Sequence, residues 1–464
     1  MIIESRLVVI LLTFTAGGLF LAISHHTANL HNYKPIAIDI LDHAHIHNDN
    51  TPLGEYNYCQ ASRPTLKTYP SPKLKGSTLM NSQIFIRHGD RTPIAVLPLD
   101  LNLTWDCTNA DAFAFTGFRT KKDERAPFQY ANVVAHQVVT TSGSPFAATR
   151  MWKGNCMPGQ LTPVGAMQHR KLGAALRQIY VDNLKSLPAD YDPETVYIRS
   201  TDFWRTKQSA ENFMAGLYGI QHHSESSPPP VLHIHTLPTE IDYLTINSGA
   251  CPRVSQLRTA IGKSSEALRK LREDNVEFNN ELIEILGEEK SWSGYLDTVM
   301  PRICHKMPLQ CNGDKCVTSK AAKRILDNVH VQNTVMYRDG NGVLELLQLG
   351  IGPLASDIKQ NLLIAKEGNS KVRLSFYSGH DTTIQPLLGM FDAEDQQWPP
   401  YASNIILELW KSSPGEHFVR VLYNGEVLDV KSNWCDLEWC PFDTFIKYLD
   451  RFILKDLMAK CQSQ

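Results

Sequence analysis

Short apolar runs alternate with segments of helical periodicity in the first half of the chain. Ile84-Phe85-Ile86 and Val196-Tyr197-Ile198 have the length and residue type of buried strands. Residues 161–187 and 205–217 carry apolar side chains at helical spacing. This alternation predicts parallel βαβ units.

The strand pattern returns near the C-terminus. Leu374-Ser375-Phe376-Tyr377 has the character of another buried strand, and residues 405–410 and 419–423 predict an antiparallel pair. Residues 255–290 and 318–329 are charged and helix-prone, with few strand signals between them. We therefore expect an α/β fold with a mostly parallel central sheet flanked by helices, and a mainly helical cap subdomain over about residues 220–340.

The N-terminal segment has a different pattern. Residues 7–23 are apolar and uncharged and follow Arg6, and as a helix they span about 25 Å, which suits a thin membrane of the early secretory pathway. We predict a transmembrane signal-anchor here, preceded by a short cytosolic tail at residues 1–6. A cleaved signal peptide ending before His25 is the alternative.

Residues 24–78 are polar and without periodicity, so they are predicted to be a flexible stem before a catalytic domain at 79–464. His43, His45 and His47 in this segment are expected to be solvated histidines rather than metal ligands.

The cysteines indicate an oxidising compartment. The chain contains 10 of them, an even and scattered set that suits up to five disulfides. Asn102-Leu103-Thr104 is a sequon for glycosylation and is consistent with lumenal exposure. Cys304, Cys311 and Cys316 with His305 are an alternative zinc set, but paired Cys-x2-Cys spacing is missing from the sequence and disulfides are favoured. We expect no metal or other cofactor.

The net charge of -2 excludes a general attraction to nucleic acid, so any anion binding must be local. Such a site is predicted where polar residues follow three strands: Arg87, His88 and Arg91; then Arg199 and Arg205; then His380 and Asp381. The crevice beyond the carboxyl ends of parallel strands is the general binding site of such sheets. Arginines that converge there would repel one another without an anion between them. Each residue alone has an ordinary structural explanation, whereas the combination predicts a phosphate site with catalytic function.

These residues resemble the histidine acid phosphatases, whose hallmarks are an Arg-His-Gly-x-Arg-x-Pro loop and a distant His-Asp pair. The resemblance extends over about residues 80–464 and includes these further segments: Leu161 to Gly173, Arg199 to Thr206 and Pro400 to Ser403. It implies that His88 is the nucleophile and Asp381 the proton donor. It also implies that Arg87, Arg91, Arg205 and His380 hold the phosphoryl group, with Arg199 supporting the loop. A neutral imidazole beside arginines can attack phosphorus without a metal, and one carboxyl group can serve as acid and then as base.

The insertion at residues 94–160 and the extra cysteines depart from typical members. These features, with Trp105 to Thr108, Leu407 to Trp410 and Val419 to Gly425, are similar to a Golgi branch that removes the 2-phosphate of xylose in the proteoglycan linkage region. The resemblance implies a type II Golgi membrane protein with a lumenal catalytic domain, a phosphorylated glycan substrate and association with linkage-region glycosyltransferases. It also implies the disulfides Cys251–Cys461 and Cys435–Cys440, and leaves the other six cysteines unassigned.

Three other functions remain open. The first is a broad-specificity lumenal acid phosphatase, since the segment from Arg199 to Asp202 has the general family pattern. The second is a phosphoglycan-binding protein without turnover, which the presence of both His88 and Asp381 disfavours. A sugar-phosphate mutase shares the Arg-His-Gly loop but gains nothing from a lumenal location.

Overall fold

The computed structural model describes residues 56–108, 110, 151–219 and 231–462 in full. It also gives the backbone of four further strands: Val9–Thr15 (β1), Gly18–Ser24 (β2), Phe118–Lys121 (β5) and Glu124–Gln129 (β6). Residues 1–49 and 50–464 form two separate units.

An eight-stranded mixed sheet forms the centre of the second unit, with the strand order β15-β14-β13-β3-β12-β8-β9 and with β16 paired to β14. Its strands are Thr78–Arg87 (β3), Val196–Ser200 (β8), Ile234–His235 (β9), Leu374–Gly379 (β12), Asn404–Lys411 (β13), His417–Tyr423 (β14), Glu426–Val427 (β15) and Cys440–Pro441 (β16). Strands β3, β12, β8 and β9 are parallel, whereas β13 and its neighbours are antiparallel. The predicted α/β class and the antiparallel pair are confirmed. Short two-stranded pairs lie outside this sheet: Thr104–Trp105 (β4) with Lys153–Gly154 (β7), and Cys311–Asn312 (β10) with Lys315–Cys316 (β11).

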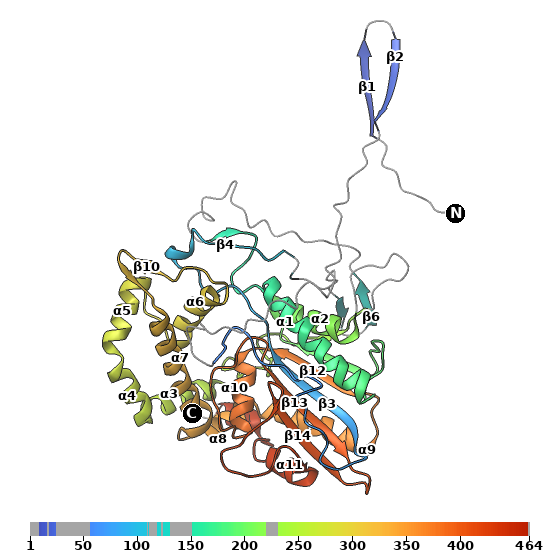
Figure 1. The fold of residues 1–464 in the computed structure, drawn as a ribbon, viewed down its shortest axis with the longest axis vertical. Coiled ribbons are helices and arrows are strands. Elements are labelled where there is room, and N and C mark those ends of the chain that lie inside the picture. The colour runs from blue at the N-terminus through green and yellow to red at the C-terminus, as the bar shows by residue number, and fades with distance from the viewer. Residues whose placement is uncertain are drawn as a thin grey trace. The chain divides into compact units, whose positions relative to one another are not determined.

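Strand β3 is buried on both faces because helices cover both sides of the sheet. Ile84 and Ile86 pack with Phe213 in one apolar cluster, while Phe85 belongs to the other cluster, as the two-residue period of a strand requires. The first face is covered by Pro163–Leu176 (α1), which continues as a π-helical segment at Arg177–Asn183 (η4), and by Trp204–Tyr218 (α2) (Figure 1). The helices on the other side are Val343–Gly350 (α8), Gly352–Glu367 (α9), Asp381–Met390 (α10), Phe442–Leu449 (α11) and Leu457–Gln462 (α12).

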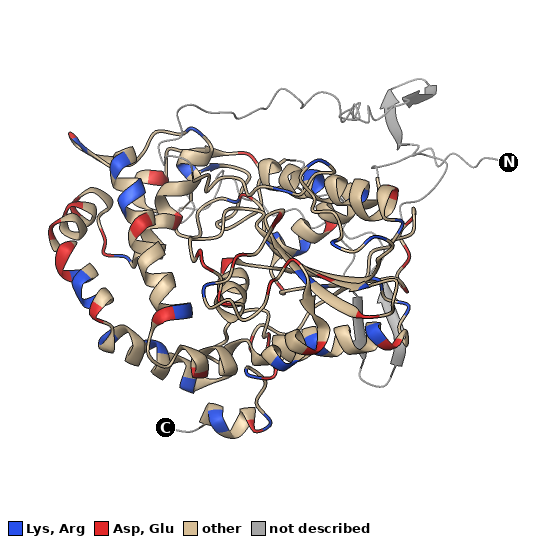
Figure 2. Ribbon diagram, turned by 60° about the horizontal axis from the view of Figure 1, so that its bottom comes forward, with Lys and Arg blue, Asp and Glu red and all other residues tan. Residues whose placement is uncertain are grey.

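The predicted helical cap is confirmed as a run of five helices. They are Pro252–Ser264 (α3), Glu266–Asp274 (α4), Val276–Leu286 (α5), Trp292–Cys304 (α6) and Ser319–Thr334 (α7), followed by a π-helical segment at Val335–Asp339 (η5). Cap residues such as Leu282 and Ile325 share one apolar cluster with Tyr377 of the sheet, so cap and sheet have a continuous core. Acidic and basic residues are interspersed along the cap helices (Figure 2), partly as pairs such as Lys270 with Asp274. A short 3-10 helix, Pro98–Asp100 (η2), lies near the cap.

The helix predicted at residues 7–23 is replaced by the strands β1 and β2, which pair in antiparallel register from Val9 with Ser24 to Thr15 with Gly18. Gly18, which lies in β2, contributes to the difference, since glycine weakens a helix interior. Among the helices that the structure describes, none combines the length and apolar content needed to cross a membrane.

The stem prediction is wrong for residues 56–78, which pack onto the catalytic unit. Tyr58 and Ala61 are buried, and the backbone of this segment forms hydrogen bonds with Tyr401 in both directions. A disulfide joins Cys59 to Cys304 at the end of α6. Polar composition misled the prediction, because a segment that covers an existing core needs few apolar residues of its own. Residues 25–55, including the three histidines of the predicted stem, lie outside the described part of the chain.

Candidate active site

The register of the parallel strands brings the three predicted groups of residues to one edge of the sheet. Arg87 at the end of β3 is paired with Gly379 at the end of β12, and β12 pairs with β8 on its other side. The chain continues this alignment beyond the strands, since the N–H of His88 donates to the Gly379 carbonyl oxygen at 2.9 Å. The imidazole rings of His88 and His380 lie 5.5 Å apart, centre to centre.

The His88 ring is held with one nitrogen available for chemistry. Its Nδ1 lies 2.8 Å from the carbonyl oxygen of Gly89, and because a carbonyl only accepts, Nδ1 carries the proton and Nε2 keeps its lone pair. Burial lowers the pKa of His88 well below its usual value, and the charges of Arg205, Arg91 and Arg87 lower it further. The imidazole is therefore neutral, as a nucleophile must be.

Arg87 is fully buried and holds the carboxyl group of Asp381. One of its terminal nitrogens lies 3.2 Å from Asp381 Oδ2, and the same nitrogen donates to the Tyr58 hydroxyl at 3.2 Å. Another donates to the Pro399 carbonyl oxygen, and the guanidinium lies 4.4 Å from the centre of the Tyr401 ring. Tyr58 belongs to the segment predicted as a stem, and the residues around it contain no signal that places it here.

Arg91 connects the loop after β3 to the cap. Its Nε–H donates a hydrogen bond to His88 Nε2 at 3.4 Å, and its Nη1 lies 2.5 Å from Asp297 Oδ1 on α6. The other oxygen of Asp297 accepts a hydrogen bond from the backbone N–H of Ile94 at 2.9 Å. No signal in the sequence identified Asp297, because it is one of many acidic residues in the helical cap.

Arg205, at the start of α2, is the one arginine of this group without an ion-pair partner in the described part of the chain. Its Nη2 lies 3.4 Å from His380 Nδ1, and its Nε is buried without a hydrogen-bond partner among the described residues. Burial first, and the charge of Arg91 second, lower the pKa of Arg205 to about 10. Because this buried cation has no carboxylate partner, binding of an anion beside it is favoured.

His380 and Asp381 begin α10, where the helix N-terminus favours negative charge. The Nε2 of His380 lies 2.9 Å from Thr201 Oγ1, on the loop after β8. Burial lowers the pKa of His380 well below its usual value, with Arg205, Arg91 and Arg87 adding to the effect. Six predicted site residues thus come together: Arg87, His88, Arg91, Arg205, His380 and Asp381.

The loop after β3 and helix α1 approach so closely that a glycine is required on each of them. A Cβ on Gly89 would lie 2.4 Å from the carbonyl oxygen of Gly165, and a Cβ on Gly165 would lie 2.2 Å from that of Asp90. This close approach presents Asp90 to Thr162, whose hydroxyl donates to Asp90 Oδ1 and also caps α1. His305 Nε2 lies 2.6 Å from the same oxygen, so the end of α6 also contacts the loop.

Arg199 lies outside this cluster of contacts. Its guanidinium is paired with Asp242 at 2.9 Å and Asp357 at 3.4 Å, and it stacks on Tyr243 at 4.1 Å. These contacts anchor the end of β8 and hold the Arg199 guanidinium on the side of Asp242 and Asp357.

All ten cysteines form disulfides: Cys59–Cys304, Cys107–Cys156, Cys251–Cys461, Cys311–Cys316 and Cys435–Cys440. Two of these pairs, Cys251–Cys461 and Cys435–Cys440, are the ones that the resemblance implied. The three cysteines of the alternative zinc set are therefore all bonded in disulfides. The described residues contain no cluster of three or more potential metal ligands. Asn102 is exposed. The insertion predicted at 94–160 is described only in part.

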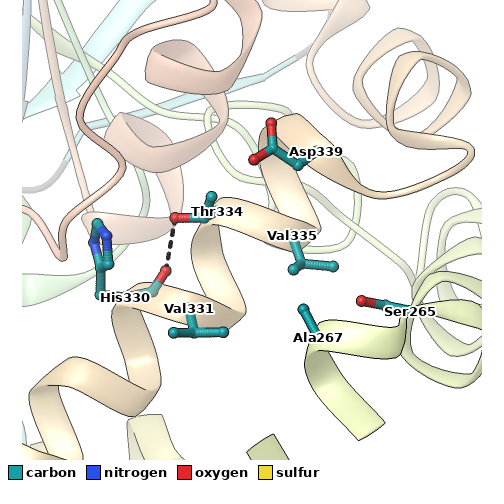
Figure 3. Close-up of a pocket in the computed structure, with 7 residues that line it drawn as sticks. All are labelled: Ser265, Ala267, His330, Val331, Thr334, Val335 and Asp339. Atoms are coloured by element: carbon teal, nitrogen blue, oxygen red, sulfur yellow. Dashed lines mark hydrogen bonds between the residues drawn. The ribbon is translucent and has the colours of Figure 1, made fainter. Parts of the chain in front are cut away.

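A separate hollow lies in the cap between α4 and the end of α7 (Figure 3), lined by Ser265, Ala267, His330, Val331, Thr334, Val335 and Asp339. Thr334 is turned onto its own helix, donating to the His330 carbonyl oxygen at 2.9 Å. Its lining contains no arginine or lysine, so this hollow lacks the converging cations of the phosphate site.

Comparison with known proteins agrees with this geometry. The sequence pattern of the histidine phosphatase superfamily (branch 2) matches residues 78–424. Counting factor 60 of Dictyostelium discoideum is 28% identical over 426 residues, which cover 88% of this chain and 92% of that protein. The human lysophosphatidic acid phosphatase type 6 is 27% identical over 80% of this chain and 83% of its own length. The human 2-phosphoxylose phosphatase 1 is 24% identical over 80% of this chain and 77% of its own length.

The solved structures agree on the fold. The phytase from Citrobacter braakii aligns with a TM-score of 0.54 at 16% identity, covering 83% of this chain and all of that one. The relatives differ in name at similar identity, so the enzyme type is shared while the substrate is not assigned by similarity. This chain belongs to branch 2 of the histidine phosphatase superfamily and is a histidine acid phosphatase-type enzyme.

Proposed function

We propose that the protein hydrolyses phosphomonoesters through a phosphorylated His88, with Asp381 as the proton donor. The observation that carries this proposal is the His88 ring itself: Nδ1 is committed to the Gly89 carbonyl oxygen, and Nε2 faces Arg91. A nucleophilic nitrogen that is neutral, buried and surrounded by arginines suits attack on a phosphoryl group.

In the first step, His88 Nε2 forms a bond to phosphorus while the bond from phosphorus to the ester oxygen breaks. Asp381 delivers its proton to that oxygen, so the alcohol leaves neutral. In the second step, a water molecule gives its proton to Asp381 and attacks phosphorus, the bond to Nε2 breaks, and inorganic phosphate is released. Arg87, Arg91, Arg205 and His380 hold the phosphoryl oxygens through both steps.

The contact between Asp381 and Arg87 supports this assignment. Arg87 approaches Asp381 Oδ2, and the backbone N–H of Thr382 donates to Oδ1 at 2.8 Å, so the carboxyl group has a fixed orientation. Its side chain is 12% exposed, so it is not sealed away from a substrate or a water molecule. These are the requirements of a group that gives and then takes a proton.

The substitution Asp381→Asn separates the role of Asp381 as proton donor from the role of His88 as nucleophile. The amide cannot donate the proton, so esters of poorly acidic alcohols should slow by more than about 100-fold, whereas p-nitrophenyl phosphate, whose leaving group needs little protonation, should form its phosphoenzyme nearly normally. Rapid-quench measurement of phosphohistidine with both ester types tests this. Equal slowing of both esters would reject Asp381 as the proton donor.

For the natural substrate, we propose the 2-phosphate of xylose in the glycosaminoglycan linkage region. Similarity to 2-phosphoxylose phosphatase 1 and the five disulfides, which suit an oxidising lumen, support it. The broad-specificity lumenal acid phosphatase is the alternative, since lysophosphatidic acid phosphatase type 6 is similar to the same extent. Phosphate release from a xylose-phosphorylated linkage oligosaccharide should exceed release from glycerol 3-phosphate at least tenfold; equal rates favour the broad-specificity enzyme.

The location is part of the same proposal. We place the catalytic domain in the Golgi lumen, glycosylated at Asn102 and attached through residues 7–23, where it would meet linkage-region glycosyltransferases. The apolar composition of residues 7–23 supports attachment to a membrane, and the exposure of Asn102 supports its modification. Carbonate extraction of membranes from cells expressing the full chain, with and without residues 1–23, tests the anchor; release of both forms would reject it.

A further inference from the structure

Two large apolar side chains stand exposed beside Arg205. Phe203, two residues before Arg205, is 39% exposed, and Ile94, directly after the loop that contains His88 and Arg91, is 54% exposed. The guanidinium of Arg205 lies 4.8 Å from the centre of the Phe203 ring. The position that a Cβ would take at Gly159 lies 3.5 Å from Arg205 Nη1 and 3.5 Å from Ile94 Cγ1, so these two atoms are at most about 7 Å apart.

Phe203 also reaches the second phosphate-binding group. Its ring meets the ring of His380 edge-on, with centres 5.1 Å apart and planes at 88°. One side of this phenyl ring is therefore fixed by His380 and Arg205, while more than a third of the side chain faces outward. Exposed apolar groups that rim a polar pocket are typical of a ligand contact.

A carboxylate lies directly beneath this apolar rim. The backbone N–H of Ile94 donates to Asp297 Oδ2, and the other oxygen of Asp297 binds Arg91. Asp297 neutralises part of the cationic charge just outside the phosphoryl position. Among the described residues, a second anionic group on the substrate would meet this apolar surface and this carboxylate.

We propose that Phe203 and Ile94 determine specificity for the leaving group, selecting phosphomonoesters whose alcohol is uncharged and presents an apolar face. This inference rests on the proposed phosphatase function and deepens it. An acyl chain and the C–H face of a sugar ring both offer such a surface, and both pack well on phenyl and aliphatic side chains. Densely phosphorylated substrates are disfavoured by the same rim.

The test compares cyclohexyl phosphate with ethyl phosphate, whose alcohols have similar acidity, so a difference in kcat/KM reports contact with the ring. The wild type should prefer cyclohexyl phosphate about tenfold, and Ile94→Ser should reduce that preference about fivefold. Phe203→Leu should reduce it less, since an apolar side chain remains. Inositol hexakisphosphate should be the slowest substrate.

Ile364→Ser is the matched control. Ile364 is 41% exposed and lies near the end of α9, which leads to the start of β12, at the edge of the sheet opposite the phosphate site. This variant should keep the wild-type preference. Thermal unfolding of each variant confirms that loss of an exposed side chain has not altered the fold.

Equal kcat/KM values for ethyl and cyclohexyl phosphate, an unchanged preference in Ile94→Ser, or fastest turnover of inositol hexakisphosphate would overturn this inference and leave the phosphatase function standing. Absence of phosphate release from every ester would overturn both. A final comparison of 1-acyl-glycerol 3-phosphate with xylose 2-phosphate distinguishes the acyl chain from the sugar ring as the source of the apolar face.

Discussion

Two groups of buried charges share the central sheet, and they differ in how completely they are paired. In the first, Glu408 of β13 and Arg420 of β14 are both fully buried, and each Glu408 oxygen accepts two hydrogen bonds. Arg420 donates in addition to the Pro70 carbonyl oxygen and the Tyr69 hydroxyl. In the second, the phosphate site, Arg205 has no carboxylate partner among the described residues and keeps a buried nitrogen unpaired.

The completeness of pairing distinguishes a structural group of buried charges from a functional one, although the two groups are chemically similar. A buried ion pair with every hydrogen bond satisfied holds strands together and has nothing left to offer a ligand. A buried arginine with an unpaired donor raises the energy of the empty protein and lowers it again when an anion binds. Substitution in the Glu408–Arg420 pair should therefore lower stability and leave activity nearly unchanged. Substitution of Arg205 should lower activity and leave stability nearly unchanged.

The largest effect is expected at the nucleophile. His88→Ala should lower kcat at least about 1,000-fold, because both ring nitrogens of the other imidazole in the pocket, His380, are engaged by Thr201 and Arg205. Steady-state assays with p-nitrophenyl phosphate measure the loss, and the absence of an acid-labile phosphoprotein after quenching confirms the step. Retention of more than a few per cent of the rate would disprove the nucleophile assignment.

Next in size is the paired network. Arg420→Met should cost about 3–5 kcal/mol of unfolding free energy, because Glu408 is left buried without its counter-charge, while kcat/KM changes little. Urea unfolding with disulfides intact measures the cost. The double variant Glu408→Leu with Arg420→Met is the control and should recover part of the loss; if the single variant is as stable as the wild type, the network is not structural.

Arg205→Met should show the reverse. Loss of one cation that holds the transferring phosphoryl group should lower kcat/KM about 100- to 1,000-fold. The free energy of unfolding should stay constant or increase, because a buried charge without a partner has been removed. The same urea and kinetic measurements apply, and a loss of stability comparable to that of Arg420→Met would remove the distinction between the two places.

The smallest single effect is the contribution that each of three buried histidines makes to the pH dependence of stability. Burial lowers the pKa of His88 and His380, and that of the buried His169 on α1 to about 3, so the unfolded chain takes up protons before the folded one does as the pH falls. Each histidine then contributes stability above pH 6.5 that is lost below it, about 2 kcal/mol between pH 7 and pH 5. Urea unfolding at both pH values should show this loss.

His169→Leu removes the contribution of one histidine to the pH dependence of the unfolding free energy. His169 has no role in the proposed chemistry, so activity does not complicate the comparison. The variant should lose about 2 kcal/mol less than the wild type on going from pH 7 to pH 5. An unchanged pH dependence would mean that His169 is not kept neutral by the fold.

The sequence by itself determined the strands that end at Arg87, Ser200 and Gly379, because each is a short apolar run followed by a charged loop and needs no distant information. It also indicated which side chains carry the chemistry, since Arg, His and Asp at those strand ends have few structural uses in combination. The resemblance to a family added the individual roles. The register of β3, β12 and β8 then showed that these residues meet.

Tertiary structure alone decided what surrounds them. Tyr58 comes from a polar segment without periodicity, and Asp297 from a cap helix more than 200 residues after Arg91. Neither position has a local signal, because a hydrogen bond or ion pair across such a separation depends on where two elements pack and not on the residues beside each partner. Local pattern sets which groups reach the edge of the sheet, whereas packing of the cap and the N-terminal segment sets which of their charges are paired and which remain open to an anion.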